Sequence, residues 1–471
     1  MNYGLRIGVN NHVTEETTEV KNKFTGETIG HISVASKEDI KHAIKIAYET
    51  FQVDSLSPYK RYEILKRASD LVKERKETLA DVLAKEVGKP IREARVEVDR
   101  AIQTLMLSAE EAKRVGGEVI PLSASPDSEN KFGFYIRVPV GVVCAITPFN
   151  VPLNLACHKL GPAIAAGNTI VWKPSSDTPI NAHMLFDILV EAGLPAGYLN
   201  LVTGPGSKVG NWLLEDKRID KYTFTGGPKV GMFIKEKSGF RNVSLELGNN
   251  SPNIVCKDAN IEKAATSLAK WGLSNAGQAC ISAQRIYVHQ EVMGSFQRIL
   301  IEEVKKVKMG NPLDEETGIG PLISKAEADR IKSWIDEAVA EGAELLVGGK
   351  QDGAFIEPTV ISKANAKMKV VCEEIFGPVM ILLPFIDIDE AITAANNSDY
   401  GLQSGIYTSS IDTAMYAVKK LHTGGVIIND GSTYRADLMP YGGVKNSGIG
   451  REGPKFTMDE MTEIKTVVMN L

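Results

Sequence analysis

The stretch Gly141–Asn150, which reads GVVCAITPFN, decides the fold. An apolar run ends at Ile146 and is followed at once by a turn. Strands that are apolar along their whole length are typical of a parallel sheet with both faces covered. Similar runs recur downstream with helical segments between them, notably Asn181–Ala192, so we predict an α/β domain. Its further strands are expected at Asn168–Trp172, Leu199–Val202, Tyr222–Phe224 and Val243–Glu246.

A second alternating region begins at Asn253 and predicts a second α/β domain. Because 471 residues are too many for one hydrophobic core, two or three domains are expected. The strands of this region are expected at Asn253–Cys256 and Arg285–Val288, and its helices from about Val292 to Val307 and from Lys325 to Glu341.

Two long helices are predicted before the first sheet. Ser57–Lys89 has apolar residues at helical spacing and is predicted as one helix, with Ser57 as its N-cap and Pro58 in its first turn. A second helix is predicted from Ile91 to about Val115.

Two β-prone segments lie outside both predicted domains. Gly117–Val140 has two such runs around a turn rich in Pro and Ser, so it predicts a projecting hairpin, and Glu463–Met469 alternates like a strand. Projecting β elements can join copies of a chain, so we expect a homo-oligomer.

The composition excludes several classes of protein. The net charge is −5 and the pI is near 5.9, so the basic surplus of a nucleic-acid binder is missing. No uncharged apolar run reaches the roughly 18 residues of a membrane span, and no secretory signal is expected, so neither a nucleic-acid nor a membrane partner is predicted. The cysteines are odd in number and widely spaced, which favours a cytoplasmic protein without a metal site: Cys144, Cys157, Cys256, Cys280 and Cys372.

The segment Asn275–Cys280 places one of these cysteines among small residues. A nucleophilic thiol needs such room, so that a carbonyl group can approach and backbone N–H groups can face the product oxyanion. A buried structural cysteine is the competing interpretation.

Polar residues follow several predicted strands. Asn150, after the first strand, could donate its amide to an oxyanion or simply form a turn. Glu246 is either a surface charge at a strand end or a desolvated general base. Lys173 could bond ribose hydroxyls or lie in solvent, and the Gly-rich turns at Gly204–Gly210 and Gly226–Gly231 could approach a pyrophosphate.

Together these pieces resemble the aldehyde dehydrogenase family from about Val20 to Met469. The motifs that carry the resemblance are Pro148-Phe149-Asn150, Lys173-Pro174-Ser175, Phe224-Thr225-Gly226, Leu245-Glu246-Leu247-Gly248, Gly277-Gln278-Ala279-Cys280 and Glu374-Ile375-Phe376-Gly377-Pro378.

The resemblance implies a mechanism with three catalytic residues. Cys280 would attack the aldehyde carbon as a thiolate, and Asn150 with the backbone N–H of Cys280 would hold the oxyanion. Hydride transfer to NAD or NADP would leave a thioester, and Glu246 would activate the water that hydrolyses it to a carboxylate.

The resemblance also implies the architecture and the coenzyme residues. It predicts a Rossmann-like NAD(P)-binding domain (1–116 and 141–247), an α/β catalytic domain (248–450) and a small β oligomerisation element (117–140 and 451–471) in a homodimer or homotetramer. The predicted coenzyme residues are Thr147, Pro148, Phe149, Lys173, Ser175, Ser176, Gly206, Gly210, Phe224, Gly226, Gly227, Gly231, Leu247, Glu374 and Phe376.

The chain departs from the family pattern at several positions. NAD-preferring members commonly have glutamate where this chain has Ser176, and serine can bond a 2′-phosphate, so NADP use is a hypothesis. The common Leu-Gly-Gly-Lys run ends here in Asn249 and Asn250, a change without an account from sequence. Ala279 and Val151 stand where non-phosphorylating glyceraldehyde-3-phosphate dehydrogenases tend to have arginine and tyrosine, which argues against that substrate.

The region around Arg435 resembles the branch of lactaldehyde, phosphonoacetaldehyde and sulfolactaldehyde dehydrogenases. Arg435 could hold an anionic substrate tail or pair with Asp437 or another carboxylate, and Arg100 is a further candidate. We therefore predict oxidation of a short aldehyde of the lactaldehyde or sulfolactaldehyde type, with or without an anionic tail.

The same residues bear on three alternative activities. Succinate-semialdehyde or non-phosphorylating glyceraldehyde-3-phosphate oxidation is the alternative within the family. Acyl transfer to coenzyme A is disfavoured because members that do it usually lack the base that Glu246 provides. A non-catalytic binding protein on this scaffold is the interpretation from another class.

Overall fold

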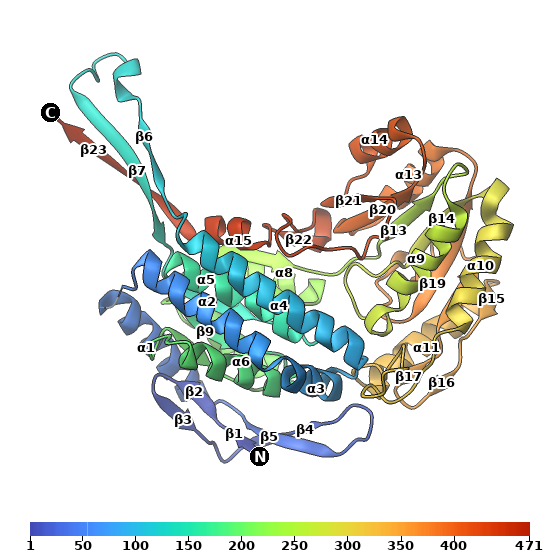
Figure 1. Ribbon diagram of the computed structural model, residues 1–471, viewed down its shortest axis with the longest axis horizontal. Helices are drawn as coiled ribbons and strands as arrows, with labels where there is room; N and C mark the ends of the chain where they lie inside the picture. Colours follow the sequence, from blue (N-terminus) through green and yellow to red (C-terminus); the bar gives the residue numbers. More distant parts are fainter. Residues whose placement is uncertain (54) are drawn as a thin grey trace.

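The computed structural model describes residues 1–53 and 55–471. Figure 1 shows two lobes and a long arm that projects from the first lobe. The first lobe is built on an eight-stranded sheet, in which strands lie in the order β22 (Gly448–Ile449), β12 (Asn242–Glu246), β11 (Lys221–Thr225), β8 (Val142–Ile146), β9 (Thr169–Lys173), β10 (Leu199–Leu201), β2 (Leu5–Ile7) and β3 (Asn10–His12).

The five central strands of this sheet, from β12 to β10, are parallel. The chain runs outward from β8 through β9 to β10 and then returns to the other side of β8 with β11 and β12. The order of connection therefore reverses between β8 and β11. In sheets of this kind, ligands bind at the carboxyl ends of the strands at that point.

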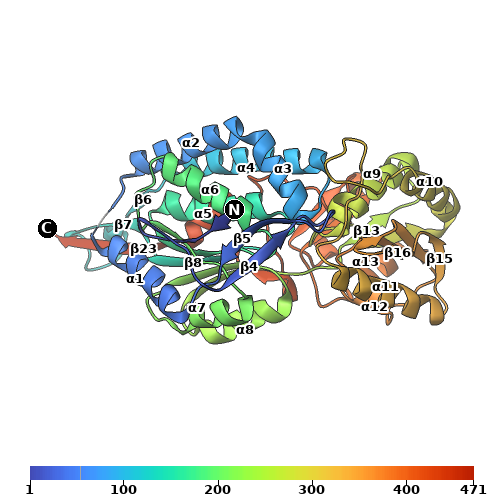
Figure 2. The same ribbon diagram turned by 90° about the horizontal axis from the view of Figure 1, so that it is seen from below.

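Helices cover both faces of the first sheet (Figure 2). Successive strand residues point to opposite faces, so Val143 and Ala145 of β8 join one core while Val142 and Cys144 join the other. One face carries α2 (Pro58–Glu74), α3 (Lys76–Val87), α4 (Ile91–Ala112), α5 (Pro152–Ala166), α6 (Pro179–Glu191) and α15 (Pro454–Glu460), and the other carries α1 (Lys37–Val53), α7 (Asn211–Glu215) and α8 (Pro228–Ser238).

The prediction of one helix over Ser57–Lys89 was wrong in one respect. The segment forms two helices, because Arg75 leaves the helical conformation at φ −104° and ψ 18°. No Gly or Pro marks that break in the sequence. The predicted N-cap is confirmed, since the Ser57 side chain accepts from the N–H of Lys60 and Pro58 opens the helix.

The second lobe contains a seven-stranded sheet that is parallel except for β15. Its strand order is β15 (Glu344–Val347), β18 (Thr359–Ser362), β19 (Val379–Phe385), β14 (Arg285–His289), β13 (Pro252–Val255), β20 (Gln403–Tyr407) and β21 (Gly425–Ile428). Its helices are α9 (Ile261–Leu273), α10 (Met293–Lys305), α11 (Lys325–Ala340), α12 (Lys369–Cys372), α13 (Ile388–Asn396) and α14 (Ile411–Lys420), and a two-stranded sheet of β16 (Gln351–Asp352) and β17 (Phe355–Ile356) accompanies them.

The arm is a three-stranded antiparallel sheet in the order β23 (Thr462–Asn470), β7 (Lys131–Pro139) and β6 (Gly117–Ile120). The predicted projecting hairpin and the predicted C-terminal strand are thus confirmed as structure, and they pair with each other. The register places four exposed apolar side chains on one face of the arm: Val119, Phe132, Ile136 and Met469.

The N-terminal region, which showed no clear pattern, also forms strands. β2 pairs antiparallel with β10 and so extends the first sheet. A separate sheet contains β1 (Asn2–Tyr3), β5 (Thr28–Ser33) and β4 (Thr17–Lys21).

The predicted domain boundaries stay a prediction, and one short strand crosses them. Gly448–Ile449 falls in the range predicted for the catalytic domain, yet it pairs with β12 in the first sheet. Among the helices of residues 1–53 and 55–471, none is long and apolar enough to cross a membrane. The same residues contain no group of three or more His, Cys, Asp or Glu that could hold a metal ion.

Candidate active site

A cavity of about 440 Å³ lies between the two lobes. It brings together the three predicted catalytic residues, which come from distant parts of the chain: Asn150 follows β8, Glu246 ends β12, and Cys280 precedes β14. Both predicted substrate residues, Arg100 and Arg435, line the same cavity. The structure thus brings the predicted catalytic and substrate residues together in one cleft.

The loop that carries Cys280 has an unusual backbone. Asn275, Ala276 and Gly277 have successive φ values of 50°, 55° and 71°, which is the left-handed region that residues with a Cβ rarely adopt. Only glycine fits at Gly277, because a Cβ there would lie 2.0 Å from the carbonyl oxygen of Gly377. The nucleophile loop is therefore wedged against the segment that contains Glu374.

Cys280 is partly exposed to the cleft, and its Sγ lies 3.0 Å from the hydroxyl of Tyr441. Burial raises the pKa of the Cys280 thiol to about 12, and the hydrogen bond with Tyr441 opposes that shift. Buried surroundings also raise the pKa values of Cys144 and Cys157, which lie in the cores of the first lobe. Cys280 differs from them in facing a cavity that also holds polar partners.

Asn150 lies beside the nucleophile loop. Its Nδ2 donates to the carbonyl of Gln278 at 2.9 Å, and its own carbonyl accepts from the side chain of Asn275 at 3.0 Å. One amide hydrogen is used in the first bond, so one remains for a ligand. These reciprocal bonds tie the end of β8 to the loop of Cys280.

Glu246 has the properties of a desolvated base. It is 4% exposed, and its Oε2 has no hydrogen-bond partner among the described residues. Burial raises its pKa well above the ordinary value, and the nearby charge of Glu452 raises it further. A carboxylate in this state holds or accepts a proton near neutral pH.

Three residues that the sequence analysis did not identify complete the charge network. Arg435 lies over the ring of Tyr441, with 3.7 Å between the guanidinium carbon and the ring centre, and pairs with Glu452 at 3.0 Å. Glu452 also pairs with Lys159 at 2.8 Å. The charges of Lys159 and Arg435 hold the pKa of Glu452 below its usual range, although burial opposes this shift. No local motif marks Lys159, Tyr441 or Glu452.

The two predicted substrate arginines are engaged differently. Arg435 pairs with Glu452 rather than with Asp437, and its side chain is only 6% exposed. Arg100 forms a two-pronged pair with Asp437, at 2.8 and 3.2 Å, but its side chain is 30% exposed. Asp437 accepts in addition from Asn154 and contacts His158, each at 2.9 Å. Arg100 is therefore the more accessible cation.

The predicted coenzyme residues gather at the carboxyl ends of the parallel strands of the first sheet. Thr147 and Phe149 follow β8, Lys173 ends β9, and Gly226 follows β11. The N-terminus of α8 has Gly227 as its N-cap without a side-chain bond, and a Cβ at Gly227 would meet open space. Uncapped N–H groups at a helix N-terminus suit a phosphate group.

Close packing explains two of the glycines in this turn. A Cβ on Gly231 would lie 2.4 Å from the side chain of Leu247, and a Cβ on Gly226 would lie 2.5 Å from the ring of Phe224. Gly206 and Gly210 instead border open space, in the segment that precedes α7.

On the opposite side of the crevice, the ring of Phe376 lies 5.9 Å from that of Phe149 in an edge-on pair. Glu374 accepts from the N–H of Asn249 at 2.9 Å, and burial raises its pKa to about 7. The segment 374–376 thus contacts the turn after β8 and the link after β12.

The serines and the lysine after β9 are bonded within the chain. Lys173 donates to the carbonyl of Pro174, Ser176 donates to that of Gly204, and Ser175 accepts from the N–H of Asp177. Burial lowers the pKa of Lys173 to about 8. Ser176 joins the turn after β9 to the turn after β10.

The structure accounts for the two asparagines that the sequence left unexplained. Asn250 donates to the carbonyls of Val371 and Cys372, both at 3.1 Å, and accepts from Ser398. Asn249 donates to Ser251 and Gln403. Both side chains join the link between the two sheets to the second lobe, and neither faces the catalytic groups.

Comparisons with known proteins identify the family. The family described as "Aldehyde dehydrogenase family" matches residues 10–467. The chain belongs to the aldehyde dehydrogenase family. It is 51% identical to a 3-sulfolactaldehyde dehydrogenase of Priestia aryabhattai, over 100% of this chain and 98% of that protein. It is 44% identical to a lactaldehyde dehydrogenase of Methanococcus vannielii, over 97% of this chain and 98% of that protein.

Solved structures of the family agree with the fold. A crystal structure of aldehyde dehydrogenase 21 from Physcomitrella patens, in complex with the reaction product succinate, has a TM-score of 0.96 at 39% identity and covers 100% of this chain and 98% of its own. A glyceraldehyde-3-phosphate dehydrogenase from Methanocaldococcus jannaschii, complexed with NADP, has a TM-score of 0.93 at 42% identity and covers 97% of this chain and 100% of its own. The predicted fold and the class, an NAD(P)-dependent aldehyde dehydrogenase, are confirmed.

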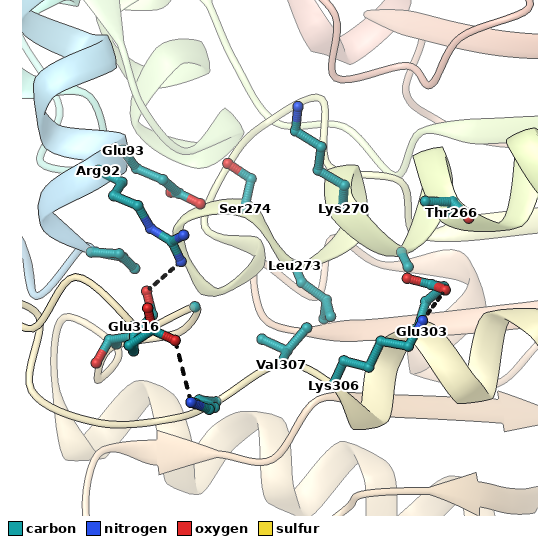
Figure 3. A pocket seen from close by; sticks show the side chains of 15 residues that line it. Arg92, Glu93, Thr266, Lys270, Leu273, Ser274, Glu303, Lys306, Val307 and Glu316 are labelled. Carbon is teal, nitrogen blue, oxygen red and sulfur yellow. Dashed lines mark hydrogen bonds and ion pairs between the residues drawn. The ribbon is translucent and has the colours of Figure 1, made fainter.

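A second cavity of about 380 Å³ adjoins the first (Figure 3). The two share Arg92, Glu93, Lys270 and Ser274, at the place where α4 meets the end of α9. Most of its charged residues are already paired, as Lys306 is with Glu303 and Lys308 with Glu316.

Proposed function

We propose that this aldehyde dehydrogenase oxidises a short aldehyde with an anionic tail, of the sulfolactaldehyde or lactaldehyde type, to the free acid. The observation that carries the proposal is the single cavity that holds Cys280, Glu246 and the accessible cation Arg100. Relatives named for these two substrates share 44–51% of its residues over nearly the whole chain.

The first step is the attack of Cys280 Sγ on the aldehyde carbon. With a pKa of about 12 the thiol is protonated at neutral pH, so its proton must pass to a base during the attack. Glu246, buried and without a hydrogen bond at Oε2, accepts the proton and releases it to solvent. The C–S bond forms, and the carbonyl π electrons move to oxygen, where the free N–H of Asn150 stabilises the charge.

The coenzyme, when bound, supplies the acceptor for the hydride that leaves the same carbon. The residues of this chain fit such a group at the uncapped N-terminus of α8, at Lys173 and at Glu374. Loss of the hydride and collapse of the oxyanion leave a thioester on Cys280. Phe149 and Phe376 pair edge-on at the crevice, where they would flank the nicotinamide.

Hydrolysis is the task of Glu246. Its raised pKa allows it to take a proton from water as the water oxygen bonds to the thioester carbon. The C–S bond then breaks, and the products are a carboxylate and the regenerated Cys280. The presence of such a base favours hydrolysis over acyl transfer to coenzyme A, because that transfer needs no activated water.

The substrate tail is assigned to Arg100 rather than to Arg435. Both arginines are paired with a carboxylate, but Arg435 is stacked on the Tyr441 ring with a side chain only 6% exposed, whereas the Arg100 side chain is 30% exposed and lines the cavity. Arg435 then acts on the reaction through Tyr441 and Glu452. Both arginines were predicted as substrate residues, and the geometry favours this division of roles.

A kinetic experiment tests this assignment. Arg100→Ala should raise KM at least about tenfold for sulfolactaldehyde, which corresponds to about 1.4 kcal/mol, and leave propanal nearly unchanged. Arg95→Ala is the matched control, because Arg95 lies on the same helix and pairs at the surface with Glu77 and Glu315. Equal effects of Arg100→Ala on charged and uncharged aldehydes would refute the assignment.

Two alternatives remain within the family, and relatives with those ligands exist. The Physcomitrella structure contains succinate, and the Methanocaldococcus protein is named for glyceraldehyde 3-phosphate. In this chain Ala279 and Val151 line the cavity, so no cation stands at either position to hold a phosphate. A panel that includes succinate semialdehyde and glyceraldehyde 3-phosphate distinguishes the three substrates by kcat/KM.

We also propose that the arm joins copies of this chain into a homodimer or homotetramer. The support is the exposed apolar face of the arm, where Val119 is 65% exposed and Ile136 is 40% exposed. Exposed apolar side chains gathered on one face are typical of an interface between subunits. Cytoplasmic localisation and the choice between NAD and NADP stay predictions, the latter resting on Ser176.

A further inference from the structure

Helix α4 carries a polar stripe that faces the active site. Glu93, Glu97, Arg100 and Thr104 are spaced by four, three and four residues, which places them on one side of the helix. Each bonds to a residue of a segment that lines or borders the cavity: Asn275, Leu153, Asp437 and Asn154, respectively.

Glu93 holds the loop of the nucleophile. Its Oε2 accepts from the backbone N–H of Asn275 at 2.7 Å. Asn275 is the first of the three left-handed residues that precede Cys280. Figure 3 shows Glu93 extending from α4 toward the end of α9, where Ser274 lies. A left-handed residue with a side chain costs about 1–3 kcal/mol, so this bond offsets part of the strain of the loop.

Glu97 holds the segment that follows the oxyanion donor. Its Oε1 accepts from the N–H groups of Leu153, at 2.8 Å, and of Asn154, at 3.3 Å. These groups belong to the first turn of α5, whose own N-cap, Val151, has no capping side chain. Glu97 therefore caps α5 from another helix. Glu97 also forms a buried ion pair with Lys89.

From this arrangement we propose that Glu93 and Glu97 are positioning residues, Glu93 for Cys280 and Glu97 for Asn150. They lie one helical turn apart, about 6 Å along α4, so the helix sets the separation of thiol and oxyanion donor. Neither residue needs to contact the substrate. The inference rests on the proposed roles of Cys280 and Asn150.

Alkylation of Cys280 by iodoacetamide tests the role of Glu93 without coenzyme or substrate. The rate is followed peptide by peptide with mass spectrometry, so that the exposed Cys372 is counted separately. Glu93→Ala should change the alkylation rate of Cys280 by at least about tenfold, since a misplacement of about 1 Å can cost a factor of about 100. The dependence of that rate on pH should shift as well. Glu93→Gln, which keeps an acceptor oxygen, should restore the wild-type rate.

Asp99→Asn is the matched control, because Asp99 is a carboxylate on the same helix that pairs with Lys76 at the surface. If Glu93→Ala does not fold, Glu93→Asp tests the same role, because it keeps the charge but shortens the side chain by one methylene group. A Cys280 rate within twofold of the wild type in a folded Glu93→Ala or Glu93→Asp variant overturns the role of Glu93.

Loss of Glu97 should lower turnover but leave the reactivity of the Cys280 thiol nearly unchanged. The double variant Lys89→Met with Glu97→Ala removes the buried pair together, so no unpaired charge remains. It should lower kcat about 10- to 100-fold through Asn150, while the Cys280 alkylation rate stays within twofold. Equal losses in both measurements would indicate general destabilisation and refute the division of roles. Full activity of Cys280→Ala would instead refute the proposed function itself, which the alkylation assay does not test.

Discussion

The loop of Cys280 and the projecting arm are built in opposite ways. The loop has a strained backbone, and it is held by side chains from distant segments, among them Glu93 and Asn150. The arm is a regular ladder of backbone hydrogen bonds between β23, β7 and β6. The difference indicates that a side-chain substitution in the loop should affect the chemistry. A substitution in the arm should instead affect the association of subunits.

Gly277→Ala should have the largest effect. The new Cβ would lie 2.0 Å from the carbonyl oxygen of Gly377, at a residue with φ 71°. Strain and overpacking together should cost about 2–5 kcal/mol of unfolding free energy and abolish turnover. Thermal unfolding and steady-state kinetics measure both. Gly294→Ala, where a Cβ meets open space on α10, is the control and should leave both nearly unchanged.

The pH dependence of turnover should distinguish the contribution of the base Glu246 from that of the Cys280 loop. Because Glu246 acts when it is deprotonated and its pKa is raised, kcat should rise as pH increases through that raised pKa. Below it, kcat should fall about tenfold per pH unit. A profile of kcat against pH for the wild type and Glu246→Gln measures this. An ascending limb that persists in the variant would show that another group is responsible.

Tyr441→Phe should have a smaller effect on the same site. It removes the hydroxyl that lies 3.0 Å from Sγ, and a hydrogen bond of this kind contributes about 0.5–1.5 kcal/mol. The rate of Cys280 alkylation should therefore fall about 2- to 10-fold. Tyr434→Phe, on the wall of the same cavity, is the control. An unchanged rate in Tyr441→Phe would exclude a role of the hydroxyl in thiolate formation.

Substitutions in the arm should leave the chemistry nearly unchanged. Val119→Lys with Ile136→Lys places two charges on the exposed apolar face, and light scattering should then detect a smaller assembly. Activity per subunit should stay within about twofold if the site is complete in one chain. Glu118→Lys, on the opposite face by register, is the control. An unchanged mass for the double variant would exclude this face as the contact.

The same contrast explains what the sequence could predict. The five parallel strands of the first sheet, β13 and β14 of the second sheet and the strands of the arm follow from local apolar patterns, whereas the other strands of the second sheet were not predicted. Cys280, Asn150 and Glu246 were predicted from their motifs. The strands near the N-terminus were missed because β2 depends on its pairing with β10. The break at Arg75 was missed because neither Gly nor Pro marks it.

The parts of the site that were missed act across long sequence separations. Tyr441 reaches Cys280, Glu452 reaches Lys159, and Glu93 reaches Asn275 only in the folded chain. Asp437 was weighed as a partner of Arg435, but it pairs with Arg100. Local spacing cannot reveal such contacts, since they form between segments that are distant in the sequence and meet only in the folded chain.

The central claim is that Cys280 forms a thioester that Glu246 removes. The most direct test is the intact mass of Glu246→Gln after mixing with aldehyde and coenzyme. The account predicts one rapid equivalent of reduced coenzyme per active site and an acyl adduct that peptide mapping places on Cys280. Rapid multiple turnover by the variant, or reduction of coenzyme without an adduct on Cys280, would contradict it.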